Sequence, residues 1–250
     1  MRGRIRLLCR LGLMLAMAAV AGCATVIPPE LAHPVSEQTL EYYPGLVKGF
    51  EHTYPLRTLL VLAVDAPCQS QSGAAASDAP PGDFQVGETV DLKGELLQRL
   101  YMAPIQGNVQ RALIAAATEA GLRAHAAPTA SYSGSSNDDY VLRAKVLQCS
   151  IKKQRVALGG AEPSWQTVAN FALDVSIFKP PFHVAFWQGT TIQTYTDPPD
   201  AGPAGADEDE VSIYDQPGQV LSVAFTRAVE GIFARPDLHS LITEDRLVHQ

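Results

Sequence analysis

The clearest periodicity in this 250-residue chain is the alternation of apolar and polar side chains over residues 167–177. A period of two is typical of a strand that buries one face. The segment 183–195, "HVAFWQGTTIQTY", has a weaker alternation that assigns Val184, Phe186 and Ile192 to one face. The strand over residues 167–177 is predicted to place six side chains on one face, directed inward: Thr167, Ala169, Phe171, Leu173, Val175 and Ile177.

Two other apolar segments predict further strands. Residues 59–64 form a short continuous run of branched side chains that Pro67 follows, and a run of this length suits a buried strand better than a helix. Residues 139–151, "DYVLRAKVLQCSI", form a longer strand candidate.

Helical spacing is evident in two segments. Residues 107–122, "GNVQRALIAAATEAGL", predict an amphipathic helix with Asn108 as N-cap and Gly121 as a left-handed C-cap. Residues 218–238 predict a second helix that Pro236 ends. Its apolar stripe consists of Val220 or Leu221, Ala224, Phe225, Ala228 and Ile232.

The order of these elements predicts the fold class and the domain limits. A strand, a helix, several long strands and a final helix favour an α+β fold, in which an antiparallel sheet carries two helices packed on one face. This domain is assigned to residues 56–243, and the Pro/Gly-rich stretch 68–83 and the acidic stretch 197–210 are loops.

The N-terminus has the pattern of an export signal. Four arginines precede an apolar run over residues 11–21, which is too short for a bilayer core that needs roughly 20 residues. The sequence Val20-Ala21-Gly22-Cys23 resembles the lipobox of bacterial lipoprotein precursors. That resemblance implies that residues 1–22 are a lipoprotein signal peptide and that Cys23 is acylated; the alternative is an ordinary signal peptide with a chance cysteine.

Acylation would fix the location of the protein. Several acyl chains anchor a protein stably, whereas one binds only marginally. Ala24 stands where an aspartate retains lipoproteins at the inner membrane, so by analogy we expect the periplasmic face of the outer membrane, with the inner membrane as the alternative. Five prolines over residues 23–55 predict a lipidated Pro-rich tether that drapes onto the domain.

Charge and cysteine content narrow the partners. The chain has 19 basic and 26 acidic side chains, and removal of residues 1–22 takes four arginines and no acid, which leaves a formal charge of about −11. This balance disfavours nucleic acid as a ligand. Beyond Cys23, the exported chain keeps Cys68 and Cys149, which either pair in an oxidising compartment or stay two separately buried thiols.

No sequence motif indicates catalysis. The chain lacks HExxH, GxSxG, GxxxxGK[ST] and GxGxxG, and "GADEDE" at 205–210 lacks the glycine and distal glutamate of a calcium loop. We therefore predict a binding protein rather than an enzyme, without metal or cofactor.

Two groups of side chains are candidates for binding a partner. Phe182, Phe186 and Trp187 belong to an aromatic cluster that either fills the core or presents outward members such as Trp187 to a partner. Lys152 and Lys153 belong to a basic stripe that either protects a strand edge or meets an acidic surface.

A wider resemblance follows from "TLLVLAVDAP", "TEAGL", "DYVLRAKV" and "ARPDLHSLI" in this order. Over residues 56–243 the chain resembles the YajG-type lipoproteins and, more loosely, auxiliary lipoproteins of envelope ABC transport systems. It departs from them by insertions at 68–104 and 197–215. The resemblance implies a membrane-anchored periplasmic domain without catalysis and supplies no functional residues.

These observations lead to two hypotheses of function. The first is an accessory or structural envelope component that docks onto another envelope protein through the exposed face or edge of its sheet. The second is a carrier or sensor that holds a small apolar or glycan ligand between sheet and helices. An open strand edge favours the first, and an enclosed apolar cavity favours the second.

Overall fold

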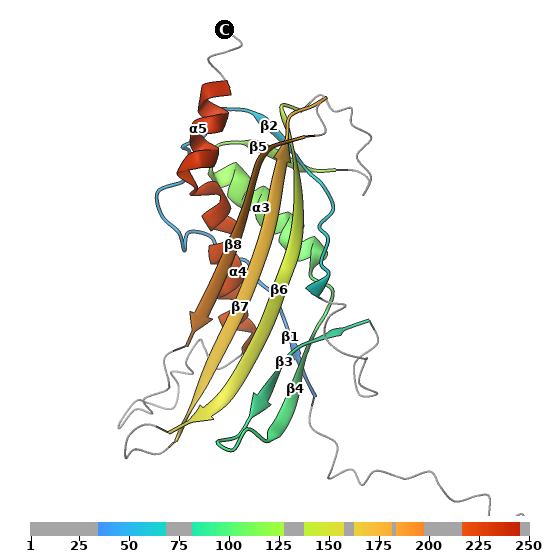
Figure 1. Cartoon of the computed structure of the whole chain (residues 1–250), viewed down its shortest axis with the longest axis vertical. Helices are drawn as coiled ribbons and strands as arrows, with labels where there is room; N and C mark the ends of the chain where they lie inside the picture. Colours follow the sequence, from blue (N-terminus) through green and yellow to red (C-terminus); the bar gives the residue numbers. More distant parts are fainter. Residues whose placement is uncertain are drawn as a thin grey trace, which may run out of the picture. The chain divides into compact units, whose positions relative to one another are not determined.

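The computed structural model describes residues 35–68, 82–127, 138–157, 163–181, 184–197 and 217–245 (Figure 1). They form one eight-stranded sheet and three helices. The elements are β1 (Val35–Gln38), β2 (Thr58–Val61), β3 (Phe84–Val90), β4 (Leu96–Met102), α3 (Gln106–Glu119), β5 (Arg123–Ala126), β6 (Tyr140–Val156), β7 (Ser164–Phe178), β8 (Ala185–Thr196), α4 (Pro217–Phe233) and α5 (Pro236–Asp245).

The long strand β6 organises the sheet. On one side it pairs with β7, which pairs with β8, and both pairings are antiparallel. On its other side β6 pairs with β2 near its start and with β3 near its end, both in parallel. Strand β5 continues the sheet beyond β2, and β4 and β1 continue it beyond β3. The predicted α+β class is confirmed, with a mixed rather than wholly antiparallel sheet.

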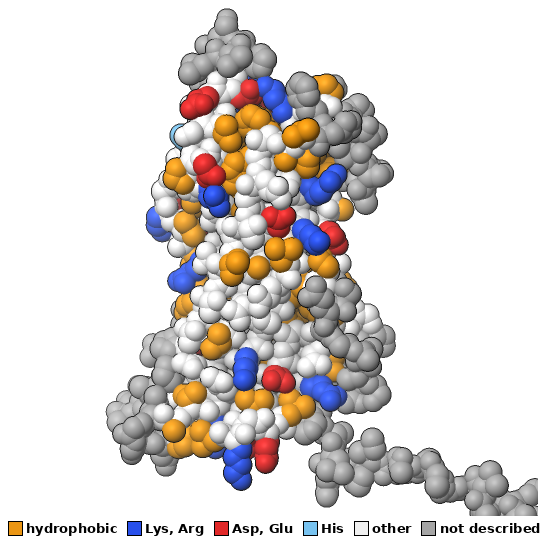
Figure 2. Space-filling model, in the orientation of Figure 1, with side chains coloured by type: hydrophobic (Ala, Val, Ile, Leu, Met, Phe, Trp, Pro, Cys, Tyr) orange, Lys and Arg blue, Asp and Glu red, His pale blue; other side chains and the backbone are white. Residues whose placement is uncertain are grey.

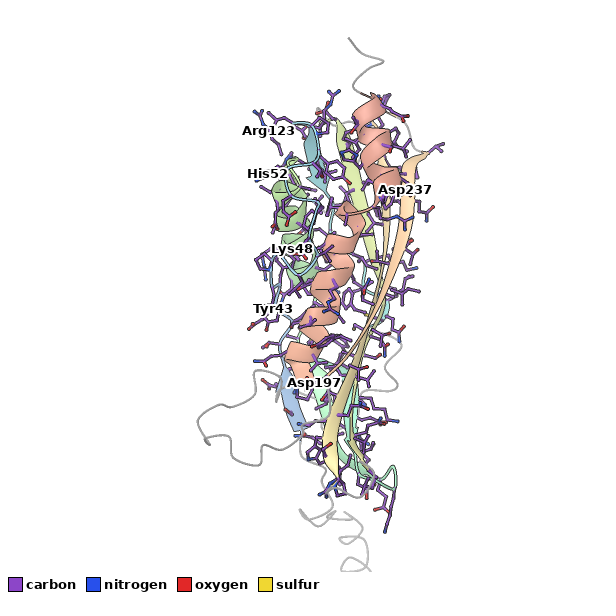
Figure 3. All side chains as sticks on the ribbon, turned by 90° about the vertical axis from the view of Figure 1, so that its left-hand side faces the viewer. Tyr43, Lys48, His52, Arg123, Asp197 and Asp237 are labelled. Atoms are coloured by element: carbon purple, nitrogen blue, oxygen red, sulfur yellow. The ribbon has the colours of Figure 1, made fainter. Side chains whose placement is uncertain are left out.

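The helices lie on one side of the sheet (Figure 3). Helix α4 packs on β6, β7 and β8, and α3 packs on β2 and β5 and also touches α4. The predicted apolar stripe of α4 is confirmed, because each of its members is fully buried. The largest fully buried side chains are Tyr101, Tyr140, Phe50, Phe171, Phe225, Phe233, Leu59, Leu100, Met102, Ile105, Leu113 and Leu142.

The two periodic strands differ in how well their faces were predicted. In β7, all six residues predicted to face inward are at most 3% exposed. In the β8 region, Val184 and Ile192, which were assigned to one face, are 80% and 69% exposed, whereas Phe186 is half-buried and Trp187 is 5% exposed. The register between β7 and β8 shifts where Phe178 pairs with Ala185, so the alternation cannot be extrapolated across that point.

Helix α3 ends as predicted and begins differently. Gly121 has φ +109°, its N–H donates to the carbonyl of Thr118, and the N–H of Leu122 donates to Ala117, which is a Schellman ending. A side chain at Gly121 would also meet the carbonyl oxygen of Tyr54 at 2.8 Å. Asn108 is not the N-cap, because the helix begins at Gln106 and the Asn108 amide instead donates to Leu40.

Part of the predicted insertion 68–104 is regular structure. Strands β3 and β4 form a hairpin whose turn is held by Asp91, because one oxygen of its carboxylate accepts from the backbone N–H groups of Lys93 and Glu95. Gly94 takes φ +83° in this turn. Asp and Gly at these positions are typical turn signals, so the sequence contained the evidence for the hairpin.

Residues 38–47, assigned above to the tether that drapes onto the domain, bind along α4. Ser222, Thr226 and Glu230 lie four residues apart along one side of α4, and each is at most 1% exposed. They accept hydrogen bonds from this segment. The contacts are Gly218 N–H to Gln38 (2.8 Å), Glu41 N–H to Ser222 (2.9 Å), Tyr43 N–H to Thr226 (3.0 Å), and Gly45 and Val47 N–H to Glu230 (both 2.6 Å). Tyr43 and Lys48 mark the segment in Figure 3.

Candidate docking edge

Strand β8 ends the sheet on one side without a further strand in the described ranges. Its twelve residues, "AFWQGTTIQTYT", include no charged side chain and no proline. Its register with β7 is unbroken from Trp187 to Thr196. Natural edge strands are usually protected from pairing by short length, charges, prolines or bulges. This edge lacks charge and proline along its whole length.

The sheet face opposite the helices is mainly polar (Figure 2). Hydrogen bonds join β8 and β7 across this face: Thr190 donates to Asp174 at 2.8 Å, and Thr194 donates to Asn170 at 2.7 Å. Cross-strand pairs of this kind stabilise the strand that carries them. Between the two threonines, Ile192 stands out as a largely exposed apolar side chain.

The helix-facing side of β8 is fastened to the junction of α4 and α5. The indole N–H of Trp187 donates to Asp237 at 3.1 Å, and Arg235 donates to both oxygens of the same carboxylate at 3.0 and 3.1 Å. The Trp187 ring also covers Gly189, where an added Cβ would lie 2.5 Å from the indole. Arg235 and then Trp187 donate hydrogen bonds that lower the pKa of Asp237 from 3.8 to about 2.

The aromatic residues predicted to bind a partner divide between the core and the undescribed part of the chain. Trp187 belongs to the core, so it is not an outward anchor. Phe186 is half-buried and packs on Tyr140, with ring centroids 5.6 Å apart. Phe182 lies outside the described residues. The sequence did not reveal Ile192 as exposed, because Trp187 and Ile192 lie on opposite faces of β8 and both are apolar.

The basic candidates, Lys152 and Lys153, lie near the end of β6. Lys152 is exposed, whereas Lys153 is half-buried and its ammonium lies 5.7 Å from the centre of the Trp165 ring. Both lie on β6, two strands away from β8. The structure therefore does not bring the basic and aromatic candidates together into one surface.

The remaining candidates are the cysteines. Cys23 lies outside the described residues. Cys68 and Cys149 are each 8% exposed, and their Sγ atoms are 3.1 Å apart. Within the described ranges, no group of His, Cys, Asp or Glu side chains is arranged to hold a metal ion. No helix in the same ranges is long and apolar enough to cross a membrane.

The space between sheet and helices is occupied by side chains. Phe171 of β7 lies 5.1 Å from Phe225 of α4, measured between ring centres, and both are fully buried. Two larger hollows, of about 550 and 590 Å³, open to solvent at the surface. One surrounds Cys68 and Cys149, and the other includes Gln98 and Trp165.

Comparison with known proteins adds only a distant similarity. No family model matches the chain, and no curated protein matches it. A Xanthomonas campestris protein of family DUF330 has 15% identity and a TM-score of 0.42, over 86% of this chain and 99% of that one. The minor lipoprotein of Acinetobacter baumannii has 13% identity and a TM-score of 0.31, over 77% and 96%.

A third solved structure, uncharacterized lipoprotein B from Nitrosomonas europaea, has 10% identity and a TM-score of 0.34, over 82% of this chain and 97% of that one. Similarities at this level carry no argument about function. None of the three is described as YajG-type, so that resemblance stays a prediction.

Proposed function

We propose that this protein is a lipid-anchored component of the bacterial envelope that docks onto another envelope protein by strand pairing at β8. The observation that supports docking is the uncharged twelve-residue edge of β8. In strand addition, an extended peptide of the partner hydrogen-bonds to the exposed main chain, and alternate side chains supply specificity. Because β8 carries no charge, we expect the partner strand to be uncharged and extended too.

The membrane anchor in this proposal is the acylated Cys23, at the periplasmic face of the outer membrane. The contacts of residues 38–47 with α4 make this part of the predicted tether a part of the domain.

Docking is better supported than the carrier function. A carrier needs an enclosed apolar cavity, whereas Phe171 and Phe225 are in contact across the layer between sheet and helix. We also propose that the protein is not an enzyme, since its sequence has no catalytic motif.

Site-specific photo-crosslinking in cells tests the docking. A photoreactive residue is placed at Thr190, Ile192 or Thr194, which share the exposed face of β8, and in matched chains at Leu56 or Arg123. A strand paired to β8 would lie within about 5 Å of the first three positions. We expect one crosslinked product common to these three and absent from the controls.

A second variant makes the crosslinking result specific to the edge. Ile192→Lys adds the charge that normally protects edge strands, and it should abolish crosslinking from Thr190 and Thr194, whereas Leu56→Lys should not. Equal crosslinking from β8 and the controls, or crosslinking that survives Ile192→Lys, would refute docking at β8. Cys23→Ala tests the anchor separately, because it should release the protein from the membrane fraction.

A further inference from the structure

Cys68 and Cys149 lie at a seam in the sheet. On the side of β6 away from β7, Asp65 continues the β2 pairing, because its N–H donates to Ala144 and its carbonyl accepts from Val146. Strand β3 begins to pair with β6 only at Ile151. Between these two pairings, no strand of the described ranges pairs with this side of residues 147–150. Cys68 comes into contact with Cys149 in this gap.

A β-bulge directs Cys149 toward this contact. Before the bulge, Leu142, Ala144 and Val146 are buried, so a regular strand would bury residue 148 next and expose residue 149. The register between β6 and β7 instead shifts between Val146 and Gln148, with Leu147 as the extra residue. The parity therefore reverses, and Cys149 is buried while Gln148 is exposed.

We infer that Cys68 and Cys149 form an intramolecular disulfide that closes this seam. Three observations support it: the Sγ atoms are in contact at 3.1 Å, both side chains are buried, and a local irregularity of β6 orients one thiol toward the other. Formation of the bond releases the two thiol protons and two electrons. The oxidant is a disulfide, either of a thiol-oxidising protein or of a small thiol, and it is reduced to two thiols.

The bond would connect two parts of the fold that are 81 residues apart in sequence. Such a cross-link stabilises chiefly by restricting the unfolded chain, and more so for a long loop. It would link the segment that follows β2 to the middle of β6. The link would lie between the β2 and β3 pairings, where no strand of the described ranges pairs with this side of β6. The contact with Cys68 and burial raise the pKa of the Cys149 thiol.

The pairing is tested first with purified protein. The full chain is reduced, freed of reductant, incubated with oxidised glutathione, denatured in the presence of N-ethylmaleimide, and digested for mass spectrometry. We expect a pair of peptides linked through Cys68 and Cys149, two hydrogens lighter than the separate thiols and separated by dithiothreitol. Maleimide on both cysteines, or glutathione bound to either, would overturn the inference.

Protein taken directly from cells separates this inference from the proposed envelope location, which would provide the oxidising conditions. If the bond forms in the purified protein while the cellular protein carries only thiols, the pairing stands and the location is wrong. As a further check, dithiothreitol should lower the thermal midpoint of the native chain. It should leave the midpoint of the Cys68→Ala/Cys149→Ala double variant unchanged, and an equal effect on both would contradict the bond.

Discussion

The two edge strands β8 and β5 of the same sheet differ in length and in charge. β5 has four residues, "RAHA", and its exposed Arg123 places a charge on the edge. The His125 Nε2 lies 3.5 Å from the Asp138 carboxylate. β8 has twelve residues and no charge. Short length and charge, which usually protect an edge strand from pairing, are therefore present in β5 and absent from β8.

The two sides of β8 also differ in their contacts. Toward the helices, Trp187 is buried and bonded to Asp237, and Thr191 donates to the carbonyl of Ala228 in α4 at 3.0 Å. Toward solvent, Ile192 is largely exposed, and on the outer edge no strand of the described ranges pairs with β8. Because these contacts hold its inner side, β8 has a fixed geometry. A partner strand would therefore pair with β8 without the entropic cost of ordering β8 first.

Trp187→Ala should have the largest effect, because it removes the fixed inner side of β8. Truncation of a buried Trp typically costs about 3–5 kcal/mol, and it also removes a hydrogen-bond donor to Asp237. Chemical denaturation should show this loss. A cost near zero would mean that β8 is not held through its inner side. Trp165→Ala is the control, since that ring is half-exposed and should cost much less.

Glu230→Gln tests the other fastened segment. The buried carboxylate accepts two backbone hydrogen bonds of 2.6 Å from Gly45 and Val47, and hydrogen bonds to charged groups are worth about 1.5–3 kcal/mol each. Part of this is retained by the remaining amide oxygen, so we expect a loss of about 2–3 kcal/mol. Hydrogen exchange should rise at residues 42–47 and stay unchanged in β8. A rise in β8 as well would contradict the independence of the two regions.

Ile192→Lys should separate stability from docking. The side chain is 69% exposed, so the free energy of unfolding should change by less than about 0.5 kcal/mol, while pairing at the edge is lost. Leu56→Lys, at a residue 65% exposed and far from β8 in sequence, is the matched control. The comparison of the two edges fails if both variants reduce docking equally.

Asp237→Asn should have a small effect on stability at neutral pH. Because the pKa of Asp237 is lowered from 3.8 to about 2 in the folded protein, its ionised form contributes stability above about pH 4. That contribution is lost as the pH falls toward 2. The carboxylate is half-exposed, so the loss at pH 7 should stay under about 1 kcal/mol. Thermal midpoints between pH 4 and pH 2 should fall less steeply in the variant; identical slopes would contradict the shift.

The elements predicted well are those that their own sequence determines. In β7 every second residue from Thr167 to Ile177 is buried, although Ala172 between them is buried too, and Gly121 is required by the left-handed ending of α3. The faces of β8 were not predictable from its alternation, because apolar side chains stand on both of them: Trp187 is buried and Ile192 is exposed. Nor was the start of α3, where Asn108 is drawn to the carbonyl of Leu40 from a segment distant in sequence.

The tether was predicted to drape onto the domain, but its contact with α4 was not predicted, although the sequence holds a sign of it. Ser222, Thr226 and Glu230 recur every four residues on an otherwise apolar helix, and buried polar groups need partners. Their partners come from a proline-rich stretch without periodicity. Local patterns do not show which distant backbone will supply such hydrogen bonds. In the same way, the sequence does not show that β8 is an edge strand, because that depends on the order of strands in the sheet.

The most direct test of the central claim is hydrogen exchange of the β8 amides in two states. The full-length, membrane-anchored protein is measured in envelope vesicles and again after purification in detergent. We predict that alternate β8 amides are protected in the vesicles and exchange faster after purification, that Ile192→Lys removes the difference, and that Leu56→Lys preserves it. Equal exchange of the β8 amides in both states would contradict docking by strand pairing at this edge.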